Sequence, residues 1–524
     1  MFLALNCTEN LSRGRTRLGW SGPPSALLSG RLTLPVFDDR ASSDYGCGVG
    51  MNWPARVASL SRRLARPDSA LAPGALFVLV VLACSPWLGA GLQNGDSAAY
   101  NEQVQHFALS RHTTHFGYLL LGLLTRPALW SGVGIDTAMN WMTLIVGALG
   151  ACGVFVAARA YASSAAAGLF ALLSVLAIPA YLEGMLLSEV DVPLAAFTAL
   201  SAAAWATQRF ALAGALYGFA MLISPLAAWT LPVFVLAFPL EGEWRSALRR
   251  QAMSLTIFGA VALLVWAPVV AFHSQNYFYS GRGIFGAPRE SFDVARHLRH
   301  SWRFAETLLP LLPLYAGGLA IALKRPWGRA GEFAPGLLVS VVAIALLGER
   351  FGDVPVQLPT AVLMSIGAGG LIYSMGQRIG RATAVAVALM CLTLTSVPGL
   401  APLRQQLADL DSERQLYLEM KRASGVLPPV LVGVSSEWSE AWRFNWIVHG
   451  RARADRAYTS ERFASIVDEY ATSETDYVFW FLVAQKRSDL DPLTPRYKRK
   501  RILLGEKRFN TLWPRGVDPA VPGA

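Results

Sequence analysis

The stretch from Met51 to Gly91 reads MNWPARVASLSRRLARPDSALAPGALFVLVVLACSPWLGAG. Its first part, 51–72, contains four arginines, and its second part, which continues to residue 92, is almost entirely apolar. A membrane-spanning helix needs roughly 20 mostly apolar residues, and basic residues beside such a helix tend to stay in the cytoplasm. The stretch therefore predicts a basic cytoplasmic segment at 51–72, followed by a first spanning helix at 73–92.

Residues 1–50, which precede this stretch, mix Arg, Gly, Ser and Pro with only short apolar runs. They lack the apolar region followed by a cleavage site that marks a secretory signal peptide. We expect them to be a disordered extension or an upstream start outside the fold.

The composition of the whole chain is typical of a membrane protein. Of its 524 residues, 53% are hydrophobic and 15% are charged, with a mean hydropathy of +0.37, whereas soluble proteins contain about 25% charged residues. The last 126 residues contain 19 basic and 16 acidic side chains, a far higher density than the rest. These numbers exclude a uniformly soluble enzyme, a disordered chain and a coiled coil. They predict an all-α polytopic membrane domain at 73–398 and a soluble domain at 399–524.

The remaining apolar runs predict how often the chain crosses the membrane. The run 211–240 is long enough for two short helices, and Ser224-Pro225 interrupts it, because proline breaks or kinks a helix. Arginines lie before and after this run, so both of its ends are expected in the cytoplasm. With this hairpin counted as two crossings, we expect eleven in all. The other runs are 138–158, 164–182, 190–207, 251–271, 307–323, 334–347, 355–374 and 382–398.

A shorter apolar stretch, 116–131, contains Arg126-Pro127. If it spanned the membrane, the later basic loops would fall outside, against the usual cytoplasmic excess of Lys and Arg. We therefore expect it to lie on the outer membrane surface as an interfacial helix. The outer side then receives the soluble domain and four loops, at 93–137, 183–189, 272–306 and 348–354.

The soluble domain alternates helical and strand-like patterns. The runs 407–421 and 460–470 are typical of helices, whereas 426–434 and 477–483 are apolar and rich in β-forming residues. A small α/β domain is expected.

The first outer loop contains Gly95-Asp96-Ser97-Ala98-Ala99-Tyr100 and then His115-Phe116-Gly117-Tyr118, and the second outer loop region reads YLEGMLLSEVDVP from Tyr181 to Pro193. An acidic residue directly after the first helix, a His-x-Gly-Tyr segment that opens an interfacial helix, and a second acidic loop together resemble the GT-C superfamily of integral-membrane glycosyltransferases. This superfamily includes protein O-mannosyltransferases and the lipid A aminoarabinose transferase. A Gly-rich hairpin from Leu212 to Pro232 and Trp266-Ala267-Pro268, expected to close a helix, add to the resemblance.

The resemblance implies catalytic roles for the acidic residues. Asp96 is the expected general base, because a carboxylate at the membrane surface can accept the acceptor's proton. The alternative is that Asp96 only caps a helix. Glu189 and Asp191 form a second acidic site that orients the acceptor or binds a divalent cation, Mg²⁺ or Mn²⁺. Their alternative role is to complement a helix dipole.

Substrate-binding residues are expected in two outer loops. Tyr100, His115 and Tyr118 are candidates for contacts with the substrate. Arg282 and Arg289 lie in the basic loop 272–306, where arginines are expected to bind the donor phosphate or anionic lipid headgroups.

Together the sequence predicts a multi-pass protein of a bacterial inner membrane. We expect it to transfer a hexose from a polyprenyl-phosphate donor to a protein, lipid or glycan acceptor on the outer face, with inversion. Its other partners are membrane lipids, and no nucleic acid is expected, because cytoplasmic loops explain the net charge of +11. The alternatives are a transporter or flippase for a lipid-linked or anionic substrate, which would show charges deep within its helices, and a structural assembly protein.

Overall fold

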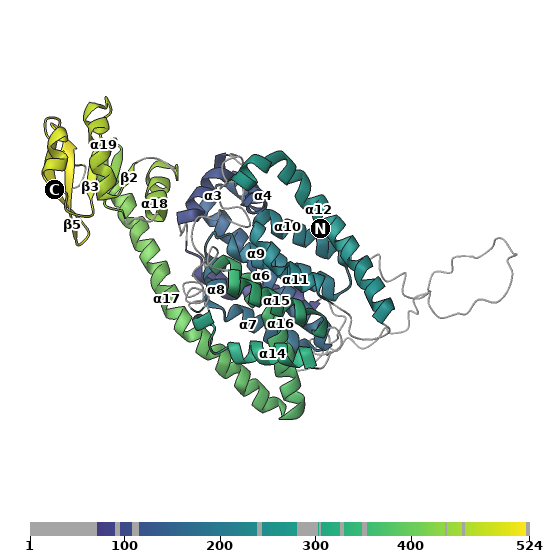
Figure 1. Ribbon diagram of the computed structural model, residues 1–524. Coiled ribbons are helices and arrows are strands. Elements are labelled where there is room, and N and C mark those ends of the chain that lie inside the picture. Colours follow the sequence, from purple (N-terminus) through teal and green to yellow (C-terminus); the bar gives the residue numbers. More distant parts are fainter. Residues whose placement is uncertain are drawn as a thin grey trace, which may run out of the picture. The chain divides into compact units, whose positions relative to one another are not determined.

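We analysed a computed structural model of the chain (Figure 1). It describes residues 71–89, 95–106, 115–237, 244–279, 302, 305–324, 330–347, 354–434, 438–452 and 456–519. The expected extension at 1–50, and nearly all of the basic segment at 51–72, lie outside the described residues. So does the loop 348–354, apart from its last residue.

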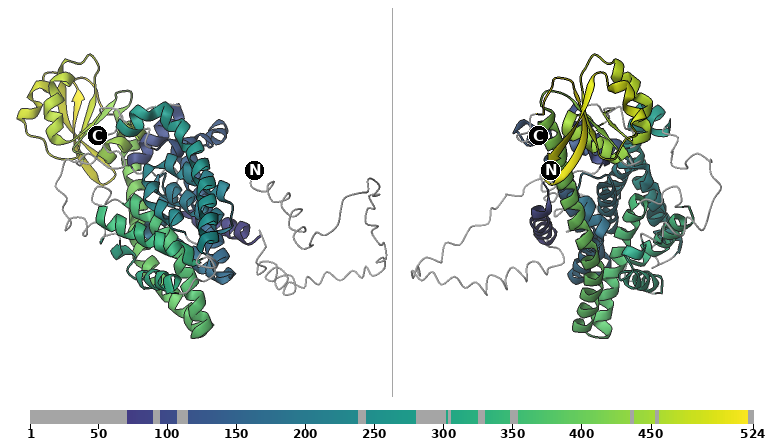
Figure 2. Two further views of the ribbon diagram at one scale, coloured as in Figure 1. Left: turned by 45° about the vertical axis from the view of Figure 1, so that its right-hand side comes forward. Right: turned by 90° about the vertical axis from the view of Figure 1, so that its left-hand side faces the viewer.

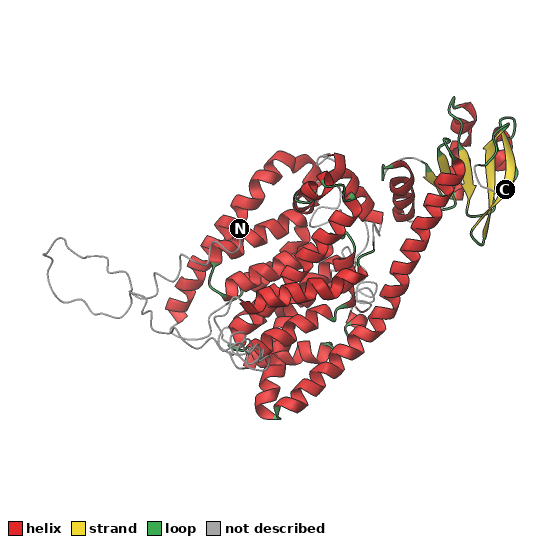
Figure 3. Ribbon diagram, turned by 180° about the vertical axis from the view of Figure 1, so that it is seen from behind, coloured by secondary structure: helices red, strands yellow, loops and turns green. Residues whose placement is uncertain are grey.

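Each apolar run of the sequence coincides with a helix or a pair of helices (Figures 1 and 3). The first run gives α2 (Leu71–Cys84) and a 3-10 turn at Ser85–Trp87. The others give α6 (Ile135–Ala162), α7 (Ala165–Leu176), α8 (Pro179–Leu186), α9 (Asp191–Ala206), α10 (Phe210–Ile223), α11 (Leu231–Val235), α12 (Trp244–Tyr279), α14 (Leu312–Lys324), α15 (Ala330–Leu347), α16 (Val354–Arg378) and α17 (Arg381–Ser424).

The described helices make this an integral membrane protein, but they do not establish the number of crossings. Four of them are long and apolar enough to span a bilayer, and the pair α7 and α8, bent by 72°, is a fifth if it counts as one span. The other apolar helices are shorter. The count of eleven therefore stays a prediction.

The expected break at Ser224-Pro225 is confirmed. Helix α10 ends at Ile223, and a 3-10 helix follows at Pro225–Thr230 before α11. The Ser224 side chain accepts a hydrogen bond from the Leu226 amide at 3.3 Å, so it caps the second segment.

The expectation that Trp266-Ala267-Pro268 closes its helix is wrong. Helix α12 passes through Pro268 and continues to Tyr279, so the stretch 272–306, expected to be a loop, begins inside a helix. Proline is tolerated within membrane helices because neighbouring groups can satisfy the backbone carbonyl that it leaves without a donor.

Small residues allow the central helices to approach closely. A Cβ atom at Gly150 of α6 would lie 2.5 Å from the Ala196 Cα atom of α9, so any larger residue would separate the two helices. Such contacts are typical of membrane bundles, where packing replaces the hydrophobic driving force.

The stretch 116–131, which is expected to lie on the membrane surface, forms two short helices, α4 (Phe116–Leu123) and α5 (Arg126–Trp130). Leu124, between them, is 73% exposed and Trp130 is 80% exposed. Large apolar side chains open to the surroundings fit a position at the membrane surface, where tryptophan is enriched.

Helix α17 is 44 residues long and includes both the last apolar run and the first expected helix of the soluble domain (Figure 2). Residue 399, where the soluble domain is expected to begin, lies inside this helix. The helix also contains Pro398 and Pro402, which do not interrupt it.

Beyond α17 the chain forms the expected α/β domain (Figure 3). Its five-stranded sheet has the order β2-β1-β3-β5-β4, in which β1 pairs in parallel with β2 and β3, and β5 pairs antiparallel with β3 and β4. The strands are β1 (Pro429–Val432), β2 (Ala457–Tyr458), β3 (Val478–Phe481), β4 (Tyr497–Leu504) and β5 (Lys507–Pro514), and the helices are α18 (Trp438–His449), α19 (Ser460–Thr472) and a 3-10 helix at Ser488–Leu493.

A neutral histidine joins α18 to this sheet. His449 Nε2 donates to the Pro429 carbonyl at 3.0 Å, and Arg456 donates to His449 Nδ1 at 3.3 Å. Burial, and then the positive charge of Arg456, lower the pKa of His449 to about 4. The geometry requires the neutral ring, because a second ring proton would point at the guanidinium group.

Candidate active site

The site is built on α3 (Gly95–His106), which begins the stretch expected to form the first outer loop. Asp96 is the second residue of this helix, and its side chain lies outside the described side chains. The next residue, Ser97, is fully buried, and its hydroxyl donates to the Ser188 carbonyl at 2.6 Å. This bond joins the neighbour of Asp96 to the neighbour of Glu189, so the backbones of the two acidic loops meet at this point.

The second loop is in turn fixed to the bundle. The Ser188 hydroxyl donates to Asn140 Oδ1 of α6, and both side chains are buried. Buried polar groups are costly unless they are hydrogen-bonded. The pair therefore fixes the position of the loop with respect to α6.

Three of the expected substrate-binding residues form one aromatic group. The ring of Tyr100 on α3 packs edge-on against His115, with centroids 5.7 Å apart, and against Tyr118 of α4, with centroids 5.1 Å apart. His115 Nδ1 lies 2.9 Å from the Ile223 carbonyl at the end of α10. A carbonyl only accepts, so Nδ1 carries a proton and donates it to this oxygen.

Close packing explains why residue 117 of the His-Phe-Gly-Tyr segment is a glycine. A Cβ atom at this position would lie 2.7 Å from the Ile223 nitrogen and 2.8 Å from the Leu222 carbonyl carbon. The start of α4 therefore packs directly on the backbone at the end of α10. This close approach positions His115 and Tyr118 on either side of the glycine.

Tyr118 connects the aromatic group to the second acidic site. Its side chain is fully buried, and burial raises the pKa of Tyr118 far above its usual value near 10; the carboxylates of Glu189 and Asp191 contribute to the same shift. The phenol is therefore neutral at pH 7 and can donate a hydrogen bond. Its electrostatic coupling to both carboxylates indicates that the three side chains lie in the same region.

Glu189 and Asp191 are both half-buried, on either side of Val190. Asp191 is the first residue of α9, so its charge also complements the helix dipole. The nearby Glu183 points elsewhere, because its carboxylate accepts a hydrogen bond from Gln406 of α17 at 2.7 Å. Of the two glutamates in this region, Glu189 is the one beside the site.

The expected phosphate-binding residues Arg282 and Arg289 lie outside the described residues. Among the residues that the structure describes, no three His, Cys, Asp or Glu side chains are close enough to bind a metal ion together. The Asp96 side chain lies outside the described side chains, so the divalent cation stays a prediction.

The sequence did not indicate one feature of the site. Asp136 Oδ1, at the start of α6, accepts hydrogen bonds from Asn101 of α3 and from the indole of Trp446 on α18, each at 2.9 Å. Trp446 follows Asp136 by 310 residues, so no local pattern could connect them. Helix α18 packs against α3 (Figure 1).

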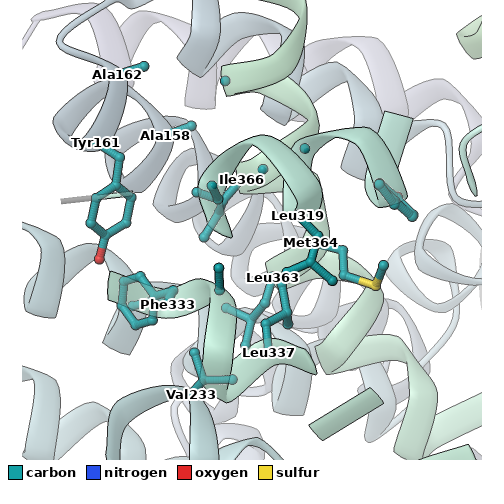
Figure 4. A pocket seen from close by; sticks show the side chains of 17 residues that line it. Ala158, Tyr161, Ala162, Val233, Leu319, Phe333, Leu337, Leu363, Met364 and Ile366 are labelled. Atoms are coloured by element: carbon teal, nitrogen blue, oxygen red, sulfur yellow. The ribbon is translucent and has the colours of Figure 1, made fainter. Parts of the chain in front are cut away.

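A small apolar pocket lies away from these residues, between α6, α14, α15 and α16 (Figure 4). Among its described lining residues, Tyr161 and Tyr315 are the ionisable ones. The α6 residues that line it, from Ala158 to Ala162, are at the opposite end of that helix from Asp136. The pocket therefore takes no part in the acidic site.

A bundle of apolar helices, two short helices beside two acidic segments, and a small α/β domain define the fold of an integral membrane protein. Two solved structures to which the chain is similar are those of ArnT, a lipid A aminoarabinose transferase, from Cupriavidus metallidurans. The apo structure gives a TM-score of 0.56 and covers 85% of this chain, and the structure bound to undecaprenyl phosphate gives 0.57 and covers 84%. Both alignments cover 98% of the ArnT chain at 16% sequence identity.

These likenesses confirm the expected resemblance to the GT-C superfamily at the level of the fold. No protein-family model matches the sequence, and no curated protein sequence matches it.

Proposed function

We propose that the chain is a membrane glycosyltransferase that moves a sugar from a polyprenyl-phosphate donor to an acceptor on the outer face of a bacterial inner membrane. The bond from Ser97 to the Ser188 carbonyl is the observation that carries this proposal. It brings together the backbones of two segments. Asp96 directly precedes Ser97 in the first, and Glu189 directly follows Ser188 in the second. We propose that the carboxylates of these two residues supply a base and a second acidic group, which a transfer reaction can use.

The donor class is supported by the fold. One ArnT structure with this fold is bound to undecaprenyl phosphate. We propose a lipid of the same class here, with its phosphate bound by Arg282 and Arg289, because guanidinium groups form bidentate hydrogen bonds with phosphate oxygens.

The proposed reaction is a single displacement. Asp96 accepts the proton of the acceptor hydroxyl or amine, whose lone pair then attacks the anomeric carbon of the sugar. The bond between that carbon and the phosphate oxygen breaks, and the polyprenyl phosphate leaves with the electron pair. Attack opposite the leaving group inverts the anomeric centre, so one base is sufficient.

Tyr100, His115 and Tyr118 are proposed to bind the substrate. Tyr118 is a neutral donor because burial raises its pKa, and the His115 ring packs edge-on against Tyr100 in the same group. Glu189 and Asp191 are proposed either to orient the acceptor or to bind Mg²⁺ or Mn²⁺. Chelation distinguishes these two roles, since only the second one makes transfer sensitive to EDTA and restores it with added metal.

The proposal is tested with purified protein in lipid vesicles that contain radiolabelled polyprenyl-phosphate sugar. Label that moves to a cell-envelope extract containing protein, lipid and glycan acceptors supports transfer, and fractionating the product identifies the acceptor class. Donor that changes leaflet or crosses the membrane without transfer would instead support the transporter or flippase.

A further inference from the structure

Helix α3 is unusual because its polar sequence is buried. The helix reads GDSAAYNEQVQH, yet every residue from Ser97 to Val104 is buried, including Asn101, Glu102 and Gln103. An isolated helix of 12 residues is marginal in water even with good helix formers. The position of α3, and of Asp96 in its first turn, therefore depends on contacts with other elements.

Two hydrogen bonds from the C-terminal domain help to hold α3. One reaches it through Asp136 of α6, and the other is made directly to Glu102. Trp446 donates to Asp136 Oδ1, the same oxygen that binds Asn101 of α3. The buried carboxylate of Glu102 accepts a hydrogen bond from the Ala452 amide at 3.2 Å. Trp446 lies in α18, and Ala452 lies in the turn that follows this helix.

The apolar contacts follow the same arrangement. Trp446 and Ala452 belong to one buried cluster with Ala98, Tyr100 and Tyr118. The aromatic group of the site and the docking face of α18 therefore share a core. A shift of α18 would open this core and expose polar groups of α3 that are now paired.

We propose that Asp136 and Trp446 are positioning residues, which make the C-terminal domain a part of the active site. Asp136 joins α3, α6 and α18 through one oxygen atom, and Trp446 supplies the bond that reaches across from the C-terminal domain. This inference rests on the proposed function for its catalytic consequence. The coupling between α18 and α3 can be measured independently of that function.

The first measurement is hydrogen exchange of the 97–106 amides in the full-length protein in lipid nanodiscs. Trp446→Phe keeps an aromatic ring and removes the N–H donor, and Asp136→Ala removes the acceptor. Each variant should raise exchange in this segment at least about threefold, because α3 loses a contact that limits its opening. Asp136→Asn keeps an acceptor oxygen and should restore slow exchange. Trp130→Phe, at a position 80% exposed, is the matched control and should change nothing.

The second measurement is the kinetics of sugar transfer. A misplaced base lowers kcat, whereas the donor site is not altered by the substitution. Trp446→Phe should therefore lower kcat about tenfold and change the donor KM less than about twofold. If exchange in 97–106 is unchanged in both Trp446→Phe and Asp136→Ala, the proposal is wrong. If exchange rises but kcat does not fall, the contact is structural and the positioning role is refuted. If the unsubstituted protein transfers no sugar, the proposed function fails, while the exchange result still decides whether the two helices are coupled.

Discussion

Ser97→Ala tests whether the meeting of the two acidic loops matters for catalysis. The Ser97 hydroxyl and its partner, the Ser188 carbonyl, are both in fully buried residues, and the bond is 2.6 Å long. Removing a buried donor leaves its acceptor unsatisfied at a cost of roughly 1–3 kcal/mol. The bond sets the separation of the two loops, so its loss should misplace the base. Most of the cost should therefore be added to the activation free energy of transfer. At about 1.4 kcal/mol per tenfold, kcat should fall about 10- to 100-fold.

The assay is transfer of radiolabelled sugar by purified variants in lipid vesicles, with thermal unfolding measured in parallel. Ser131→Ala is the control, because the Ser131 hydroxyl donates to the Ala128 carbonyl at 2.7 Å on an exposed turn. It removes a bond of the same kind where water can replace it, so transfer should be normal. A Ser97→Ala protein that transfers sugar as fast as this control would refute the argument that the bond positions the catalytic groups.

Three further predictions concern other parts of the chain. Gly117→Ala should impair transfer and lower the unfolding temperature, because its Cβ atom would lie 2.7 Å from the Ile223 nitrogen; unchanged unfolding would contradict the close packing. Arg282→Ala and Arg289→Ala should each raise the donor KM about tenfold or more, because a charge-assisted bond to phosphate is worth roughly 1.5–3 kcal/mol; normal donor kinetics in both would leave headgroup contact as their role. Burial lowers the pKa of His449 to about 4 from 6.5, so its contribution to stability is complete above about pH 6.5 and is lost as the pH falls towards 4. Unfolding of the C-terminal domain should be about 1–2 kcal/mol easier at pH 5 than at pH 7.5 after allowance for solvent screening, and His449→Gln should remove this difference.

The sequence was sufficient to predict the apolar helices of the membrane domain, because each of them leaves an apolar run and the break at Ser224-Pro225 is local chemistry. Helix α3 leaves no such run, because its sequence is polar. The continuity of α17 was not visible, since its composition changes from apolar to charged near Pro398 while the backbone stays helical. The hairpin of β4 and β5 was missed for a related reason. Residues 498–501 read KRKR and face partly outward, so the strand lacks an apolar pattern.

The candidate site was predictable only where its residues lie close in sequence or match a known pattern. Asp96, His115 and Glu189 stand beside helix ends that apolar runs delimit, which made them visible. Asp136 and Trp446 were not, because an aspartate in the first turn of a helix and a tryptophan in a soluble domain have ordinary local explanations. Only the folded chain shows that they share a hydrogen bond.

The most direct test of the account is sugar transfer by Asp96→Asn. Asn and Asp cap helices about equally well, so the variant should fold and insert normally, and Glu189→Gln serves to test the second acidic site separately. If Asp96 is the general base, transfer should fall at least about 100-fold, the lower end of what a positioned base contributes. Transfer at the normal rate by a stable Asp96→Asn protein would contradict the catalytic assignment and leave the likeness to the GT-C superfamily as one of fold alone.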